Sequence, residues 1–111
     1  WYRRSIEQDY WMAKNNLAWI LSTADDDAFR DGKVALKIIE SIDMDELAED
    51  SRLAVLDTYA AVYAEAGRFV DAVMAQERAV AMFKKSNADH KEIEGAEKRL
   101  HFYQQKKPWR E

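Results

Sequence analysis

The segment "LDTYAAVYAEAGRFVDAVMAQERAV" (residues 56–80) decides the fold of this chain. Apolar residues recur at steps of three and four on both sides of Gly67, and this spacing is typical of one face of an α-helix. Gly67 separates the two runs and suits the left-handed backbone that often follows a helix. The segment therefore predicts two antiparallel helices joined by a very short turn.

The same helical spacing continues toward the N-terminus. Residues 2–23 contain no Gly or Pro. They fit either one long helix or a shorter helix that begins near Asp9, a residue suited to an N-cap. Asp31 is expected to cap a second helix, whose apolar stripe runs over residues 34–42. The polar link that follows has room for a short helical turn near Met44.

Toward the C-terminus, the pattern breaks once more before a last helical stripe. Ser86 and Asp89 have the spacing of a capping pair at the start of that helix. We expect one domain in which helix pairs occupy residues 10–42 and 51–85, and a capping helix occupies residues 88–105.

The composition agrees with an all-α fold. The chain has 111 residues, of which 48% are hydrophobic and 34% are charged, as is typical of a soluble globular domain. It contains only 3 Gly and 1 Pro. Because sheets need turn residues at short intervals, this scarcity favours long helices and few turns.

Both helix pairs resemble the tetratricopeptide repeat. The residues that match its spacing in the second pair are Leu56, Tyr59, Ala60, Tyr63, Gly67, Phe69, Ala72 and Ala79. Those in the first pair are Leu17, Ala18, Leu21, Ala35 and Ile39. Lys14 and Gln76 depart from the pattern, and "NNLAW", "RDG", "LDT" and "KKPWRE" are similar to segments of bacterial repeat proteins. The resemblance implies an α-solenoid of helix hairpins with a C-terminal capping helix.

The resemblance also implies a groove, lined by the first helix of each pair. The groove residues that it implies are Met12, Asn15, Trp19, Asp57, Ala61 and Ala64, and Asn16 lies next to them as a second amide. Trp19 fits either the groove or a packing position, and the two Asn fit either ligand binding or a polar gap between helices. A site that grips a peptide's terminal carboxylate is not expected, because Asp57 and Ala61 stand where basic or amide groups are needed.

The charge distribution argues against nucleic acid as a partner. Residues 1–50 carry 6 Lys and Arg against 12 Asp and Glu, whereas residues 51–111 carry 11 against 9. Nucleic-acid binders usually present a broad basic face, because contacts to phosphates supply most of their affinity. Here the basic residues cluster only near the C-terminus.

The acidic stretch Asp25–Asp26–Asp27 raises the question of a metal site. With Gly32 as the sixth residue of a calcium loop, Phe29 takes the third position and Ile38 the twelfth, and neither side chain can ligate calcium. We therefore expect a solvated bend between two helices, with Phe29 packed on the core.

No other pattern indicates chemistry, and we expect no enzymatic activity, metal or cofactor. Glu94, Glu97 and His101 share one helical face, but a metal site in a helical bundle needs matching ligands from other helices. The chain has no Cys, no Gly-flanked Ser turn and no Gly-rich phosphate loop.

The expected function is that of a protein-interaction module that binds a peptide or helix in its groove. The alternative is a terminal segment that self-associates or caps a longer repeat protein. The chain begins at Trp1 rather than Met, so we expect a fragment of a longer protein. No apolar run is long enough to span a membrane, and the absence of Cys fits the cytoplasm and the periplasm equally.

Overall fold

The computed structural model describes residues 2–26, 28 and 30–110, without the side chains of residues 2–9 and 46. The elements in chain order are α1 (Tyr2–Thr23), α2 (Gly32–Glu40), the 3₁₀ turn η2 (Met44–Glu46), α3 (Glu49–Glu65), α4 (Phe69–Lys85) and α5 (His90–Gln104). No strand occurs in the described part of the chain, so the prediction of an all-α protein is confirmed.

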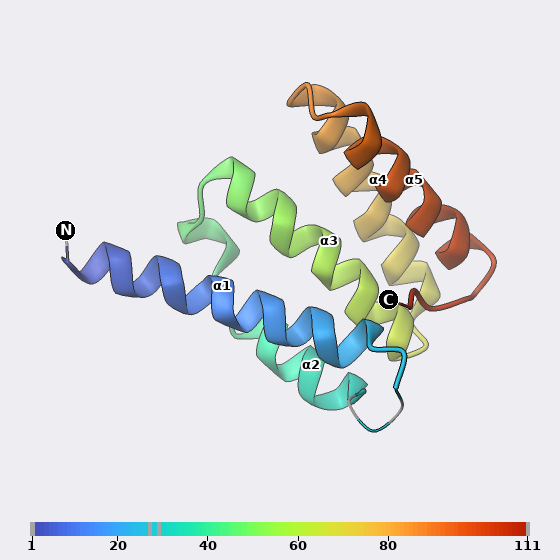
Figure 1. The fold of residues 1–111 in the computed structure, drawn as a ribbon, viewed down its shortest axis with the longest axis horizontal. Helices are drawn as coiled ribbons and strands as arrows, with labels where there is room; N and C mark the ends of the chain where they lie inside the picture. The colour runs from blue at the N-terminus through green and yellow to red at the C-terminus, as the bar shows by residue number, and fades with distance from the viewer. Residues whose placement is uncertain (1, 27, 29, 111) are drawn as a thin grey trace.

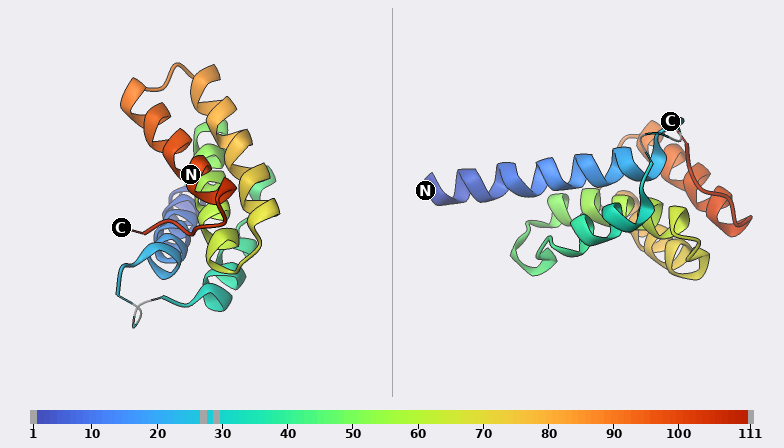
Figure 2. Two further views of the ribbon diagram at one scale, coloured as in Figure 1. Left: turned by 90° about the vertical axis from the view of Figure 1, so that its right-hand side faces the viewer. Right: turned by 90° about the horizontal axis from the view of Figure 1, so that it is seen from below.

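The third helix lies at the centre of the fold (Figure 1). α3 contacts α1, α2 and α4, and α5 packs against α4. Figure 1 shows α3 between the α1–α2 pair and the α4–α5 pair, and Figure 2 shows the same helices from two further directions. The first expected helix pair, residues 10–42, contains most of α1 and all of α2. The second expected pair, residues 51–85, contains most of α3 and all of α4.

Small residues form the contact between α3 and α4. Ala60 and Ala64 of α3 are buried in one cluster with Ala72 and Ala79 of α4. Because each of these side chains is a single methyl group, the two backbones can approach closely while larger residues fill the space beside them. Tyr103 of α5 is fully buried in the same cluster, so the last helix also contributes to this core.

A second buried cluster lies between α1, α2 and α3. Its members are Ala18, Ala35, Ile39, Ile42, Val55 and Val62. Val55 and Val62 belong to α3, and their neighbours Leu56 and Ala60 belong to the first cluster. α3 therefore buries residues on two opposite sides, and its sequence does not show the single apolar face of a surface helix.

The turn after α3 has the expected glycine. Gly67 has a φ of 82°, and the N–H of Arg68 donates a 2.8 Å hydrogen bond to the carbonyl of Tyr63. Any side chain at Gly67 would strain this left-handed backbone, which is why Gly favours this position. The prediction of a helix end at Gly67 is confirmed.

The turn after α4 differs from the expected capping pair. Asp89 alone is the N-cap of α5, and its side chain accepts a hydrogen bond from the N–H of Lys91. The Ser86 hydroxyl donates instead to the carbonyl of Phe83 within α4. Asn87 takes the left-handed backbone with a φ of 57°, so Ser86 belongs to the end of α4 and the predicted Ser86–Asp89 pair was wrong.

The N-terminal half resolves the alternatives that the sequence left open. Residues 2–23 form one continuous helix, so Asp9 is not an N-cap. Asp31 is the N-cap of α2, and its Oδ1 accepts a 3.2 Å hydrogen bond from the N–H of Val34. The expected packing of Phe29 lies outside the described residues, as does Asp27.

We predict that Ala60→Leu will lower the free energy of unfolding by about 1–3 kcal/mol, because the fully buried Ala60 has no room for three more carbons. Thermal and urea unfolding followed by circular dichroism will measure the loss. Ala81→Leu is the matched control, since Ala81 is exposed on α4 and a surface change there should stay within about 0.5 kcal/mol. Equal melting temperatures for the two variants would contradict the α3–α4 packing.

Asp31→Ala should cost about 0.5–2 kcal/mol, because it leaves the N–H of Val34 without the carboxylate that caps α2. Asp25→Asn is the control, since the polar contact shown for residue 25 uses its backbone carbonyl, which the change retains. The same unfolding measurements apply. A stability loss from Asp25→Asn as large as that from Asp31→Ala would show that the acidic bend does more than connect two helices.

Candidate binding cleft

An open cleft of about 560 Å³ lies where α1, α3 and the turn between α4 and α5 meet. The residues that line it are Asn15, Asn16, Trp19, Asp50, Leu53, Ala54, Asp57, Thr58, Phe83, Ser86, Ala88 and Glu92. Three segments that are distant in sequence thus contribute to one concave surface. Its size is in the range of natural ligand pockets.

The helical repeat places the lining residues on two facing helices. On α1, Asn15 and Trp19 are one turn apart, and Ala18 beside them is fully buried in the core. On α3, Asp50, Ala54 and Asp57 follow each other at steps of four and three, so they share one face. The buried side of each helix therefore fixes the direction in which its cleft residues point.

A bidentate ion pair joins α3 to α5 beside the cleft. Arg99 Nε and Nη2 lie 3.2 and 3.1 Å from the two carboxylate oxygens of Asp57. Only 14% of the Arg99 side chain and 16% of the Asp57 side chain are exposed. Paired oxygens and nitrogens in this fork geometry make a strong, directional contact, so Asp57 is oriented and neutralised by Arg99.

Two tryptophans flank the guanidinium of Arg99. Its central carbon is 5.8 Å from the ring centre of Trp19 and 6.0 Å from that of Trp109. Trp109 in turn packs edge-on against Phe102, with ring centres 5.0 Å apart. Trp19 is half-buried and lines the cleft, so it takes part both in packing and in the exposed surface.

Asn15 has a buried carbonyl in this cleft. Its Oδ1 is shielded from solvent and accepts no hydrogen bond from the described residues. An unpaired buried acceptor costs about 1–3 kcal/mol relative to one that is bonded.

Four of the predicted groove residues lie together in the cleft: Asn15, Asn16, Trp19 and Asp57. Met12 is exposed on α1 but does not line the cleft. Ala61 and Ala64 are buried, with exposures of 1% and 2%, and do not line it either. Their position follows from the burial of α3 on two sides, which leaves no open face along its second half.

Sequence reasoning missed the rest of the lining. Asp50 and Leu53 belong to the first turns of α3 and lie about two turns and one turn before Asp57, so helical spacing could have placed them on the same face. Phe83 and Glu92 come from the two sides of the α4–α5 turn. Their place in the same cleft as α1 residues depends on tertiary packing, which no local spacing reveals.

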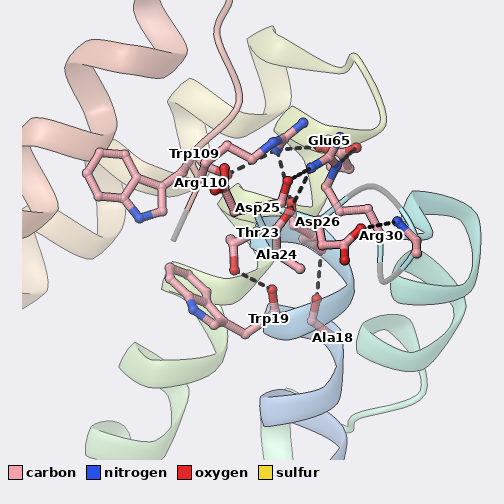
Figure 3. Close-up of polar contacts among 12 residues, drawn as sticks. Ala18, Trp19, Thr23, Ala24, Asp25, Asp26, Arg30, Glu65, Trp109 and Arg110 are labelled. Carbon is pink, nitrogen blue, oxygen red and sulfur yellow. Dashed lines mark hydrogen bonds and ion pairs between the residues drawn. The ribbon is translucent and has the colours of Figure 1, made fainter.

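A second polar centre joins the C-terminal segment to the ends of α1 and α3 (Figure 3). Arg110 Nη1 lies 2.7 Å from Glu65 Oε2 and donates a 3.3 Å hydrogen bond to the carbonyl of Ser22. Arg30 Nε lies 3.5 Å from Glu65 Oε1 on the other side. A Cβ atom on Gly32 would lie 3.3 Å from Glu65 Cγ, so glycine permits this close approach. Glu65 therefore links Arg30 before α2 and Arg110 after α5 to the end of α3.

The bend at Asp25 and Asp26 is organised by the Arg30 guanidinium and by an Asx turn. Arg30 Nη1 donates to the carbonyls of Ala24 and Asp25, at 2.7 and 3.0 Å. Asp26 Oδ1 accepts from the N–H of Ala28, as in an Asx turn. No group of three His, Asp or Glu side chains with metal-binding geometry occurs in residues 10–26, 28, 30–45 and 47–110.

The acidic face of α5 makes ordinary surface contacts. Glu94 pairs with His90, and Glu97 pairs with Lys84 of α4. The imidazole Nε2 of His101 lies 2.9 Å from the amide nitrogen of Gln105. Each side chain of the Glu94, Glu97 and His101 set thus contacts a different neighbour.

No protein-family model matches this chain, and no curated protein or solved structure matches it with significance. The resemblance to the tetratricopeptide repeat thus stays a prediction. None of the described helices has both the length and the apolar character needed to cross a bilayer.

Replacing Arg99 with Met should cost about 1–3 kcal/mol of stability, because the largely buried carboxylate of Asp57 loses its bidentate partner. Glu94→Gln is the control. It breaks the pair with His90, in which 66% of the Glu94 side chain is exposed, and should change stability by less than about 0.5 kcal/mol.

A double-mutant cycle will test whether the loss belongs to the pair. Adding Asp57→Asn to Arg99→Met should recover part of the stability, since the stranded charge is then gone. Strictly additive losses in urea unfolding would contradict a direct Arg99–Asp57 interaction.

Proposed function

We propose that this chain is a protein-interaction module of tetratricopeptide-like architecture, which binds a peptide or a helix of a partner protein in the cleft. The observation that carries the proposal is the cleft itself, which unites α1, α3 and the α4–α5 turn and has Trp19 on its wall. A helix or extended peptide binds such a surface by placing apolar side chains in it and hydrogen bonding at its polar edges.

The lining residues supply both kinds of contact. Leu53, Ala54 and Phe83 offer apolar surface, and Trp19 adds a large ring that loses little conformational freedom on binding. Asn15 and Asn16 offer amides that can bond to a peptide backbone. This combination of an aromatic anchor with polar groups is typical of interaction sites.

We propose binding rather than catalysis. The two hydroxyl groups of the lining donate to carbonyls of their own helices, Thr58 to Ala54 at 3.2 Å and Ser86 to Phe83 at 3.1 Å. A hydroxyl nucleophile needs an adjacent base that takes its proton. In these two contacts the proton is directed toward a backbone carbonyl instead.

The test is a selection of peptides from a random library displayed on phage, followed by affinity measurements on the selected peptides. Trp19→Ala should weaken their binding by about tenfold or more, because it removes the largest side chain of the cleft. Met74→Ala is the control, since Met74 is exposed on α4 and does not line the cleft. Selected peptides that bind both variants as well as they bind the wild type would place the site elsewhere.

Self-association is the second candidate function, and a different surface favours it. Tyr10, Ala13, Leu17 and Ile20 are exposed on α1 at steps of three, four and three. This is the spacing of a coiled-coil seam, so the same helix of a second copy could pack against it. Sedimentation velocity at increasing concentration will show a dimer that Leu17→Lys abolishes, and a monomer at all concentrations would exclude this candidate.

A further inference from the structure

We infer that the cleft selects a cationic peptide, and that a Lys or Arg side chain of the partner enters between the first turns of α3 and α5. The inference rests on the proposed function and specifies the chemistry of the partner. It follows from the charges of the lining, from the state of its hydrogen-bonding groups and from its apolar surface.

The lining contains acidic side chains but no basic one. Asp50, Asp57 and Glu92 line the cleft, whereas none of its lining residues is Lys, Arg or His. Asp57 is neutralised by Arg99, which bonds both of its oxygens. Asp50 and Glu92 form no ion pair with any described side chain. Two carboxylates therefore remain without a cation on one concave surface.

Asp50 and Glu92 stabilise the helix starts at which they lie, but this role does not cancel their charge. Asp50 and Glu92 lie in the first turns of α3 and α5, where the helix dipole favours a negative side chain. The dipole contributes only about half a positive charge at each helix start. The two helices are far apart in sequence, and the fold brings both acids to the same cleft, so the lining residues keep a net negative charge.

The hydroxyl groups of the lining also favour a donor as ligand. Thr58 and Ser86 both donate to carbonyls of their own helices, so neither hydroxyl proton is available to an acceptor of a ligand. These two groups therefore offer no donor to a carboxylate, whereas an ammonium or guanidinium brings its own donors.

The apolar surface fits the stem of a long basic side chain. Leu53, Ala54, Phe83 and Ala88 line the cleft together with the two acids. Lys and Arg bury their methylene groups on apolar surface while the charged end stays at polar groups. A basic residue therefore satisfies both parts of the lining, which neither an acidic residue nor a purely apolar one does.

The experiment is the random-peptide selection carried out on the wild type and on Asp50→Asn/Glu92→Gln. The expected result is an excess of Lys and Arg over Asp and Glu in peptides selected by the wild type, and no excess with the double variant. The control is Asp45→Asn/Glu77→Gln, which removes the same charge from exposed sites outside the cleft. Circular dichroism will establish whether each variant is folded. If a double variant does not fold, its two single variants will be tested in its place.

Affinities of the selected basic peptides complete the test. The double variant should weaken their binding by about fivefold or more, while the control should change it less than about twofold. Added salt should weaken binding to the wild type more than binding to the double variant, because salt screens the attraction to Asp50 and Glu92.

The other outcomes separate the two proposals. Selected peptides without a basic excess, whose binding Trp19→Ala still abolishes, would overturn the inference and leave the peptide-binding function standing. No enrichment of any peptide would overturn both. Basic peptides that bind the double variant as tightly as the wild type would show that the peptide's Lys or Arg side chain binds elsewhere, and the inference would be wrong.

Discussion

The packing of α3 between two layers of helices is the constraint on which the rest of the structure depends. Ala60 and Ala64 let α4 approach one side, while Val55 and Val62 meet α1 and α2 on the other. A helix enclosed in this way has a fixed rotation about its axis, because a change that relieves one contact disturbs the opposite one. The first turns of α3 extend past this enclosed part, and there Asp50, Leu53 and Ala54 line the cleft.

Charged contacts then fix how the outer parts sit on this centre. The Asp57–Arg99 pair joins α3 to α5, and Glu65 contacts both Arg30 and Arg110. Ion pairs that are mostly shielded from water gain little net stability, because desolvation offsets much of their attraction. Their directionality is more important here, since each pair accepts only one arrangement of the groups it joins. The C-terminal segment in particular ends beside α1 because Arg110 reaches the carbonyl of Ser22 (Figure 3).

Local signals in the sequence predicted much of the fold. The period of the apolar residues, Gly67 and Asp31 predicted helices and helix ends correctly, because each of these signals acts within one or two turns of backbone. The cleft could be predicted only in part. The tetratricopeptide resemblance implied that Ala61 and Ala64 line a groove, but the two-sided burial of α3 places both side chains in the core. Glu92 has no local feature that connects it with α1, so its place in the lining depends on tertiary packing alone.

The intramolecular environment of Arg99 offers a precedent for a cation at this surface. A guanidinium there is held by the carboxylate of Asp57 and lies near the ring of Trp19, which contributes its electron-rich face. Asp50 and Glu92 line the same cleft and have no such cation among the described residues. The chain thus supplies its own cation where α3 must be joined to α5, and leaves two carboxylates open where the surface is concave. That difference within one cleft is the physical reason to expect the missing cation from a partner.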